Sequence, residues 1–283
     1  HAFWVWFKDE MEKIKQDVYL VGEVWSEAKD VAPYLEGLPS LFNFDLGYAI
    51  THVAKAGRDS IGLVSRYKEI RDYYKSITND YLDATFIKNH DQTRLLSELG
   101  GDVNKNKIAA SLLLTMPGTP YIYYGEEIGM LGDKLSTYED QFGPDAFVRE
   151  PFVWDESDKD TMHTSWEIPR YSTAETVTPF AQQKRDQGSL LNFYKKLISF
   201  RNSSRPLTYG DIELAGTHIE EVVSFKRTHE NEELLVLHNV SDVEVTITPE
   251  EAFEKIVFTT VGDVAIEAGE LTLPAYSTVI LKK

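Results

Sequence analysis

Two carboxylates follow short apolar runs of the chain, and paired carboxylates are the groups that cleave glycosidic bonds. Glu23 lies near the C-terminal end of the run 18–24. Asp91 follows the run 84–87 and the dipeptide Asn89–His90. In such a pair, one carboxyl group is the general acid, and the other is a nucleophile or stabilises an oxocarbenium-like transition state. Glu23 and Asp91 are therefore candidate catalytic residues; the alternatives are a solvated loop residue for Glu23 and a helix cap for Asp91.

The neighbours of these carboxylates have side chains that bind sugars. His90 can donate a hydrogen bond to a sugar hydroxyl, and Trp25 offers an apolar ring face on which a sugar can stack. A core aromatic is the alternative for Trp25. These residue types predict a carbohydrate site if the two apolar runs end at the same edge of a sheet.

Strand-like runs alternate with helical patterns up to residue 125. The expected strands are 18–24, 41–44, 84–87 and 120–125, and the expected helices are 3–15, 46–56, 63–76, 105–116 and 189–202. Apolar runs joined by helices are typical of a parallel sheet buried on both faces, whose sites lie at the C-terminal strand ends. The segment 129–187 has little periodicity, and a loop of that length is unusual in a compact domain unless it is functional.

The pattern changes near residues 203–206. Short alternating runs separated by turns follow at 219–227, 233–240, 243–247, 255–260 and 277–281. Such runs predict an antiparallel β-sandwich. The sequence thus predicts an α/β chain with a βα domain over 1–202 and an all-β domain over 203–283. No cluster of aromatic residues marks the second domain as carbohydrate-binding, so we expect it to be a structural cap.

The composition limits the partners of the chain. Asp and Glu number 46 against 29 Lys and Arg, which gives a formal net charge of −17. This balance argues against nucleic acid and anionic membrane surfaces, and it is compatible with a neutral substrate such as a sugar. The absence of cysteine excludes disulfides and thiolate chemistry. No apolar segment is long enough to span a bilayer.

Three stretches resemble conserved regions of the α-amylase family of glycoside hydrolases. They are Val21–Trp25, Phe86–Asp91 and Thr115–Gly129. The resemblance covers residues 3–202 in the family's order and spacing, and the predicted sandwich also fits. It implies that 1–202 is the C-terminal half of a TIM (β/α)8 barrel, with strands 5–8, followed by the β-sandwich.

The resemblance also implies a role for most candidate residues. Glu23 matches the general acid/base, and Asp91 matches the carboxylate that binds sugar hydroxyls and stabilises the transition state. His90 matches the histidine that binds substrate where the bond is cleaved. Asp145 and Arg149 resemble an Asp/Arg pair that holds the sugar on its non-reducing side, with a surface i,i+4 ion pair as the alternative.

One part of the family pattern is missing. The family has a nucleophilic aspartate after its fourth strand, but only Asp9 and Asp17 precede Glu23, and neither follows the expected strand. The chain also starts within a helical pattern, without an initiator methionine or a signal-peptide pattern. We therefore expect the N-terminal half of the barrel to lie on a separate chain, and this chain alone to be inactive.

The implied reaction is hydrolysis of α-1,4-glucosidic bonds in starch-like α-glucans or malto-oligosaccharides by double displacement with retention, with Trp25 on the leaving-group side. The alternatives are an α-glucosidase, an oligo-1,6-glucosidase or a glucan transferase of the same family, or a non-catalytic carbohydrate-binding member. No metal ligands are expected here, because the family's calcium ligands come largely from the missing half. The composition is compatible with a secreted or cell-surface bacterial enzyme but does not define the compartment.

Overall fold

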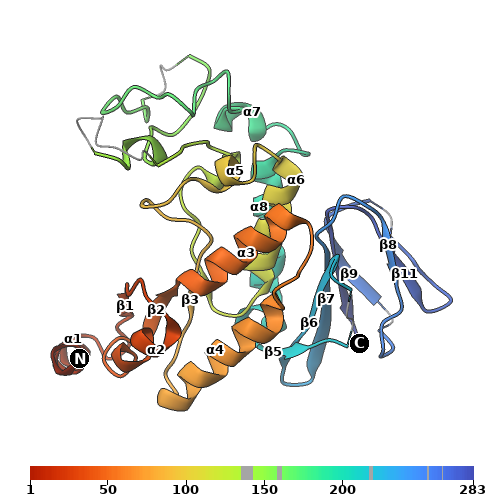
Figure 1. The fold of residues 1–283 in the computed structure, drawn as a ribbon, viewed down its shortest axis with the longest axis horizontal. Helices are drawn as coiled ribbons and strands as arrows, with labels where there is room; N and C mark the ends of the chain where they lie inside the picture. Colours follow the sequence, from red (N-terminus) through yellow and green to blue (C-terminus); the bar gives the residue numbers. More distant parts are fainter. Residues whose placement is uncertain (135–142, 158–160, 217–218, 254, 263) are drawn as a thin grey trace.

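The computed structural model describes residues 1–134, 143–157, 161–216, 219–253, 255–262 and 264–283. Short parallel strands lie at one side, helices occupy the middle, and an antiparallel β part lies at the other side (Figure 1). The described parts of the segment 130–187 gather at one end of the molecule, beyond α5 (Leu95–Glu98) and around α7 (Phe180–Gln183) (Figure 1). Among the described residues, no helix is both long enough and apolar enough to cross a membrane.

A four-stranded parallel sheet organises the first part of the chain. Its strands lie in sequence order, as β1 (Val21–Gly22), β2 (Ser40–Asn43), β3 (Ala84–Thr85) and β4 (Thr119–Pro120). The longer helices between and around them are α1 (Ala2–Ile14), α3 (Phe44–Ala56), α4 (Leu63–Ile77), α6 (Val103–Thr115) and α8 (Leu190–Ser203). Parallel strands joined by helices form the βα pattern that the sequence predicts. Among the described residues, β1 and β4 each pair on one side only.

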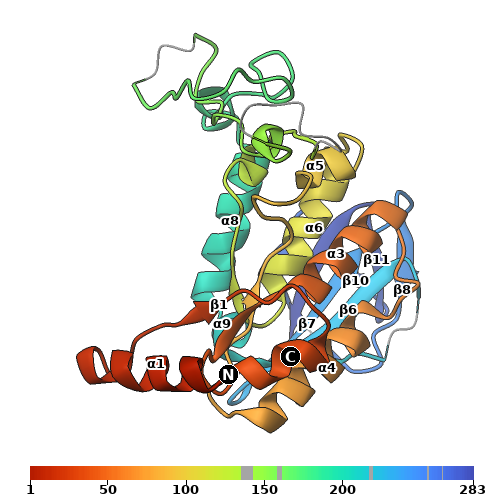
Figure 2. The same cartoon turned by 60° about the vertical axis from the view of Figure 1, so that its left-hand side comes forward.

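Short helical turns complete this part. They are α2 (Ala28–Val31), η1 (Ala32–Tyr34), η2 (Glu126–Ile128), η3 (Ala146–Val148) and α9 (Arg205–Tyr209). Figure 2 shows α1 at the periphery beside β1. None of the α1 residues is fully buried, which places this helix outside the core.

Two predictions about the strands are wrong. The apolar runs 18–24 and 84–87 pair over only two residues each, and the run 120–125 pairs only at Pro120. Hydrophobicity reports burial, and Phe86 and Ile87 remain buried past the point where their strand pairing ends. The prediction that the run 18–24 is buried on both faces also fails, because Tyr19 and Val21 are largely exposed beside an open strand edge.

The all-β part contains two antiparallel sheets. The five-stranded sheet has the order β5 (Asp211–Leu214), β6 (Val222–His229), β7 (Glu232–Asn239), β12 (Ser277–Lys282) and β9 (Lys255–Thr259). The three-stranded sheet has the order β10 (Ile266–Glu267), β11 (Glu270–Leu273) and β8 (Val245–Ile247). Leu237 and Val279 from the larger sheet pack with Leu271 and Leu273 from the smaller one. The predicted β-sandwich is therefore present, with three strands that the sequence did not predict.

The two parts share one hydrophobic core. Helices α3, α6 and α8 supply residues such as Ile50, Leu112 and Leu197, and the five-stranded sheet supplies Phe225 and Val236 to the same cluster. This face of the sheet is therefore apolar because helices cover it, as layered packing requires. The predicted boundary after residue 202 falls one residue before the end of α8, and the division into two domains stays a prediction.

Two buried arginines, Arg201 and Arg227, donate hydrogen bonds to the carbonyls around the turn that follows α6. The helix ends before Pro117, so its last carbonyl groups need partners outside the helix. Arg201 donates to the carbonyls of Leu114, Met116 and Gly118 at 2.7–2.8 Å. Gly118 has a positive φ of 105°, and a Cβ at this position would lie 2.8 Å from the Asp83 carbonyl oxygen.

A buried histidine also joins the two parts. His238 of β7 lies 3.0 Å from the Thr115 hydroxyl through Nε2 and 2.7 Å from the Thr278 hydroxyl through Nδ1. Its side chain is fully buried, and this burial lowers the pKa of His238 to about 3. The imidazole is therefore neutral in the folded protein at neutral pH.

This histidine predicts acid lability. The unfolded chain takes up a proton at His238 as the pH falls through about 6.5, whereas the folded chain does so only near pH 3. His238 therefore makes its full contribution to the free energy of unfolding above pH 6.5. As the pH falls from 6.5 to 3, this contribution decreases by about 1.4 kcal/mol per pH unit. Urea unfolding at pH 7, 6 and 5 should show a shallower pH dependence for His238→Gln than for the wild type. The exposed His52 provides the control, and equal slopes for His238→Gln and His52→Gln would contradict the prediction.

Candidate active site

The predicted catalytic stretches meet at one edge of the parallel sheet. Glu23 directly follows β1, and Asn89–Asp91 follow β3. Parallel strands present their C-terminal ends on the same side, which explains why these distant stretches converge. One pocket is lined by Glu23, Phe42, Phe86, Lys88, Asn89, His90, Tyr121, Ile122 and Tyr123. The structure thus brings Glu23 and His90 to a common cavity.

Aromatic side chains form a continuous wall beside this pocket. Trp25 stacks on Phe44 with ring centroids 4.9 Å apart and planes 11° from parallel. Phe44 in turn contacts the edge of Phe86, and Phe42 contacts both Phe86 and Tyr121. Trp25 itself is 52% exposed, so it lies at the rim of the wall instead of in the core.

Asp91 lies in a network of charged groups. Arg149 donates from Nη2 to Asp91 Oδ1 at 2.6 Å and to Asp145 Oδ2 at 3.2 Å. The same guanidinium donates from Nε to the His90 carbonyl at 2.8 Å. His90 Nε2 lies 3.4 Å from Asp91 Oδ1. Asp145 and Arg149 therefore form the i,i+4 ion pair that was the alternative to a sugar-holding role, but the pair also contacts the predicted catalytic loop, and the sugar-holding role stays a prediction.

Lys134 belongs to this network but was not predicted from the sequence. Its Nζ lies 3.0 Å from Asp145 Oδ1 and donates to the Asp91 carbonyl at 3.1 Å. No local pattern signals this role, because Lys134 is 43 residues from Asp91 in the chain. Glu23 remains outside the network, and among the described residues it makes no hydrogen bond or ion pair with Asp91.

The segment after residue 129 is held by buried polar contacts. Glu150 is fully buried, and its carboxylate accepts backbone N–H groups of Arg170, Tyr171 and Ser172 at 2.7–3.2 Å. The Ser172 hydroxyl exchanges hydrogen bonds with the backbone of Leu131. Charge-assisted bonds of this kind order a segment that lacks long helices or strands. The predicted loop 129–187 also includes 135–142 and 158–160, which lie outside the described residues.

Two further acids, Glu126 and Glu127, lie in the turn that follows β4. Glu126 is buried, and its Oε1 accepts a hydrogen bond from the Tyr194 hydroxyl at 3.0 Å. Burial raises the pKa of Glu126 to about 8 and also raises the pKa of Glu127. The contact with Tyr194 joins the turn after β4 to helix α8, as a structural role requires.

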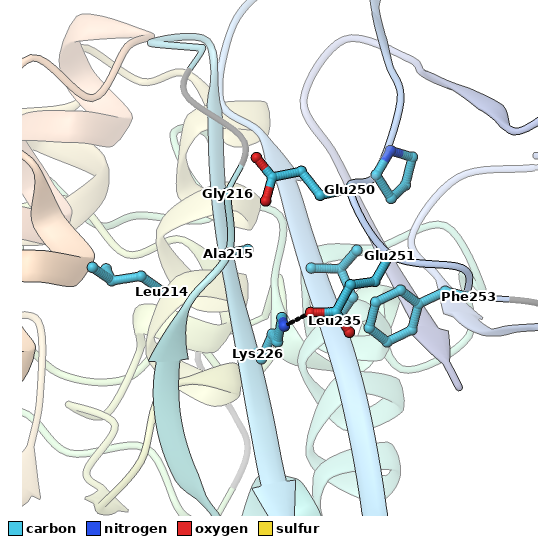
Figure 3. A pocket seen from close by; sticks show the side chains of 9 residues that line it. Leu214, Ala215, Gly216, Lys226, Leu235, Glu250, Glu251 and Phe253 are labelled. Carbon is cyan, nitrogen blue, oxygen red and sulfur yellow. Dashed lines mark hydrogen bonds and ion pairs between the residues drawn. The ribbon is translucent and has the colours of Figure 1, made fainter.

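A second pocket lies in the all-β part (Figure 3). Lys226 on β6 pairs with Glu251 at its base, and Glu250 lies close to Gly216 (Figure 3). Phe253 is the aromatic residue of this lining, and it is nearly buried. Sugar-binding sites use accessible ring faces. This pocket therefore adds no stacking platform to the all-β part, and the structural-cap role remains a prediction.

No group of three or more His, Cys, Asp or Glu side chains is placed to hold a metal ion within the described part of the chain. The expectation about calcium concerns residues that are not in this sequence, so it stays a prediction.

The pocket at the strand ends of the βα fold is lined by one carboxylate, Glu23, by His90 and by aromatic side chains, and Trp25 stacks on Phe44 nearby. The model of the α-amylase catalytic domain matches residues 1–210, and the model of the α-amylase SusG C-terminal domain matches residues 222–280. The chain belongs to the α-amylase family of glycoside hydrolases. The family and fold class predicted from the sequence are thus confirmed.

Several characterised proteins are similar to this chain. Alpha-amylase 3 of Dictyoglomus thermophilum is 36% identical over 280 residues, which cover 99% of this chain and 54% of that protein. Alpha-amylase SusG of Bacteroides thetaiotaomicron is 34% identical, covering 94% of this chain and 38% of that protein. The crystal structure of an α-amylase from H. orenii superposes with a TM-score of 0.88 at 38% identity, over all of this chain and 56% of the other. The chain therefore spans about half the length, or less, of these relatives.

Proposed function

We propose that this chain supplies the acid/base and the stabilising carboxylate of a site that hydrolyses α-1,4-glucosidic bonds in starch-like α-glucans with retention. The observation that carries the proposal is the shared pocket of Glu23 and His90, beside which Arg149 holds Asp91. The names of the relatives support the substrate class, because the first two are α-amylases.

In the proposed mechanism, Glu23 donates a proton to the leaving glycosidic oxygen and later removes one from water. Asp91 binds sugar hydroxyls and stabilises positive charge on the ring. His90 contacts the sugar at the cleaved bond, and Trp25 stacks against the leaving group. Asp145 and Arg149 hold the sugar on the other side.

The nucleophile must come from residues outside this sequence. Retaining hydrolysis needs a second carboxylate about 5–5.5 Å from the acid. The open edges of β1 and β4 are positions where further parallel strands could pair. We propose that the N-terminal half of the barrel occupies them and carries the nucleophilic aspartate.

A glucan transferase or an oligo-1,6-glucosidase is the second candidate. More distant relatives have the names 4-alpha-glucanotransferase and oligo-1,6-glucosidase, at 28% and 29% identity. The segment after residue 129, which Glu150 holds in place, is the observation that favours this candidate, since it could narrow one end of the cleft. Retained Glu23, His90 and Asp91 argue against a non-catalytic member.

The 283-residue chain alone is expected to release no reducing sugar from starch, because it lacks the proposed nucleophile. Adding a barrel N-terminal half, such as the matching half of the D. thermophilum relative, should restore hydrolysis. Rates on starch, maltose and isomaltose would then separate the candidates. Full starch turnover by the purified chain, together with a monodisperse 32.3 kDa monomer that unfolds cooperatively, would contradict the two-piece proposal.

A further inference from the structure

A buried arginine lies directly after the candidate catalytic loop. Arg94 is 2% exposed, and its guanidinium carbon lies 4.7 Å from the ring centroids of both Tyr123 and Tyr124. Its Nη1 donates to the Tyr124 carbonyl at 2.7 Å, and its backbone N–H donates to the Gly132 carbonyl at 2.9 Å. A cation between two tyrosine rings fixes both rings through cation–π contacts and a directed hydrogen bond.

The two tyrosines hold the backbone on either side of Arg149. The Tyr123 hydroxyl donates to the Val148 carbonyl at 3.0 Å, and the Tyr124 hydroxyl donates to the Glu150 carbonyl at 2.8 Å. Arg149 lies between these two anchored residues, so its backbone position depends on where the tyrosine rings lie.

We propose that Arg94 is a positioning residue, which holds Arg149 against Asp91 through Tyr123 and Tyr124. The line of contacts runs from Arg94 to the rings, from the ring hydroxyls to the backbone around Arg149, and from the Arg149 guanidinium to the Asp91 carboxylate. The inference rests on the proposed function only in one respect, which is that Asp91 binds the sugar hydroxyls.

The backbone around Arg94 fits this role closely. Gly125 has a positive φ of 84°, and a Cβ there would lie 2.9 Å from Arg94 Nη1. A side chain at residue 125 would therefore press on Arg94 as well as on Met130, whose Sδ would lie 2.3 Å from that Cβ.

A counter-ion role is the competing explanation. The charge of Arg94 lowers the pKa of the buried Glu126 and Glu127, although burial outweighs it. However, Nε and Nη2 of Arg94 find no hydrogen-bond partner among the described residues. The hydrogen bond and the ring contacts of this guanidinium thus go to the tyrosines and not to the acids, as a positioning role requires.

Hydrogen exchange of the 283-residue chain distinguishes the two roles. The amides of Val148 and Arg149 are hydrogen-bonded within the turn, to Asp145 and Ala146. Arg94→Met should raise their exchange rates at least about tenfold, because the turn then opens locally. Arg94→Lys keeps a cation near the rings and should fall between the wild type and Arg94→Met.

Arg201→Met is the matched control, since Arg201 is equally buried and also donates to backbone carbonyls, far from this turn. At equal distance below its melting temperature, it should leave the exchange of Val148 and Arg149 unchanged. A lower melting temperature for Arg94→Met with wild-type exchange at these two amides would overturn the proposal in favour of the counter-ion role.

Titration with maltotriose tests whether Arg94 affects sugar binding through Arg149. If the wild type binds maltotriose, Arg94→Met and Arg149→Met should weaken binding to a similar extent, and the double variant should be no weaker than Arg149→Met. Additive losses would contradict a shared path through Arg149. If the wild type does not bind maltotriose, the proposed function loses support, whereas the exchange rates still decide the role of Arg94.

Discussion

Replacing Arg227 by methionine is expected to lower the free energy of unfolding by about 3–5 kcal/mol. The side chain is fully buried at the junction of the two parts of the chain. It donates from Nη2 to the carbonyls of Leu207 and Gly210 at 3.0 and 2.8 Å, from Nε to that of Asp211 at 3.2 Å, and from Nη1 to that of Thr115. Methionine has a similar length but donates to none of these carbonyls, so all four lose a partner inside the protein.

Chemical denaturation at pH 7 measures this loss. Lys282→Met is the matched control, because Lys282 lies on the same sheet in an exposed pair with Glu232 at 2.5 Å. Exposed pairs contribute about 1 kcal/mol or less, so this variant should remain close to the wild type. A loss below about 1 kcal/mol for Arg227→Met would mean that water reaches the four carbonyls and replaces the guanidinium.

Replacing Glu23 by glutamine is expected to lower kcat on starch by about 10²–10⁴-fold in the reassembled two-part enzyme. Glutamine keeps the size of the side chain but has no proton to donate to the leaving oxygen. The other residues that line the pocket should keep their positions. Glu23 is exposed, and among the described residues it makes no hydrogen bond or ion pair with Asp91.

A comparison of substrates with different leaving groups tests proton donation by Glu23 more directly. A dinitrophenyl maltoside needs little proton donation, so its cleavage by Glu23→Gln should fall far less than starch hydrolysis. Glu27→Gln is the control, because Glu27 is an exposed acid on the same loop that pairs with Lys29. Equal losses on both substrates would assign Glu23 to substrate binding or folding instead of proton donation.

The parts of the fold that were predicted are those with a long repeating signal. Helices α3, α4, α6 and α8 begin and end within about three residues of the predicted ranges. Three of them, α3, α4 and α8, have a sustained apolar stripe, and α6 is a long apolar run that ends just before Pro117 and Gly118. The strand β5 was missed since Asp211–Leu214 buries only Ile212. Pairing of β3 also ends before its apolar run does, because Phe86 and Ile87 are buried beyond the paired residues.

The candidate site also contains some residues that a local sequence pattern predicts and others that only the tertiary structure identifies. Glu23, His90 and Asp91 follow strand-like runs, so a local pattern predicted them. Lys134 and Arg94 act through contacts that the tertiary fold creates. Arg94 meets Tyr124 across 30 residues of sequence, and nothing near it indicates that its partners would be two rings and a carbonyl. Only the structure shows how Arg94 reaches the turn around Arg149.

The turn after α6 has a consequence for synthesis on the ribosome. Its carbonyls depend on Arg201 and Arg227, which lie 85 and 112 residues further along the chain from Met116 and Thr115. At about 5–20 residues per second, these carbonyls remain without their arginine partners for on the order of ten seconds of synthesis. During that interval α6 presents the apolar residues that later meet the five-stranded sheet. The nascent chain therefore passes through a stage in which the helices of this core are made and the strands that cover them are not. We expect chaperones to bind the nascent chain most strongly at this stage, before the last strands emerge.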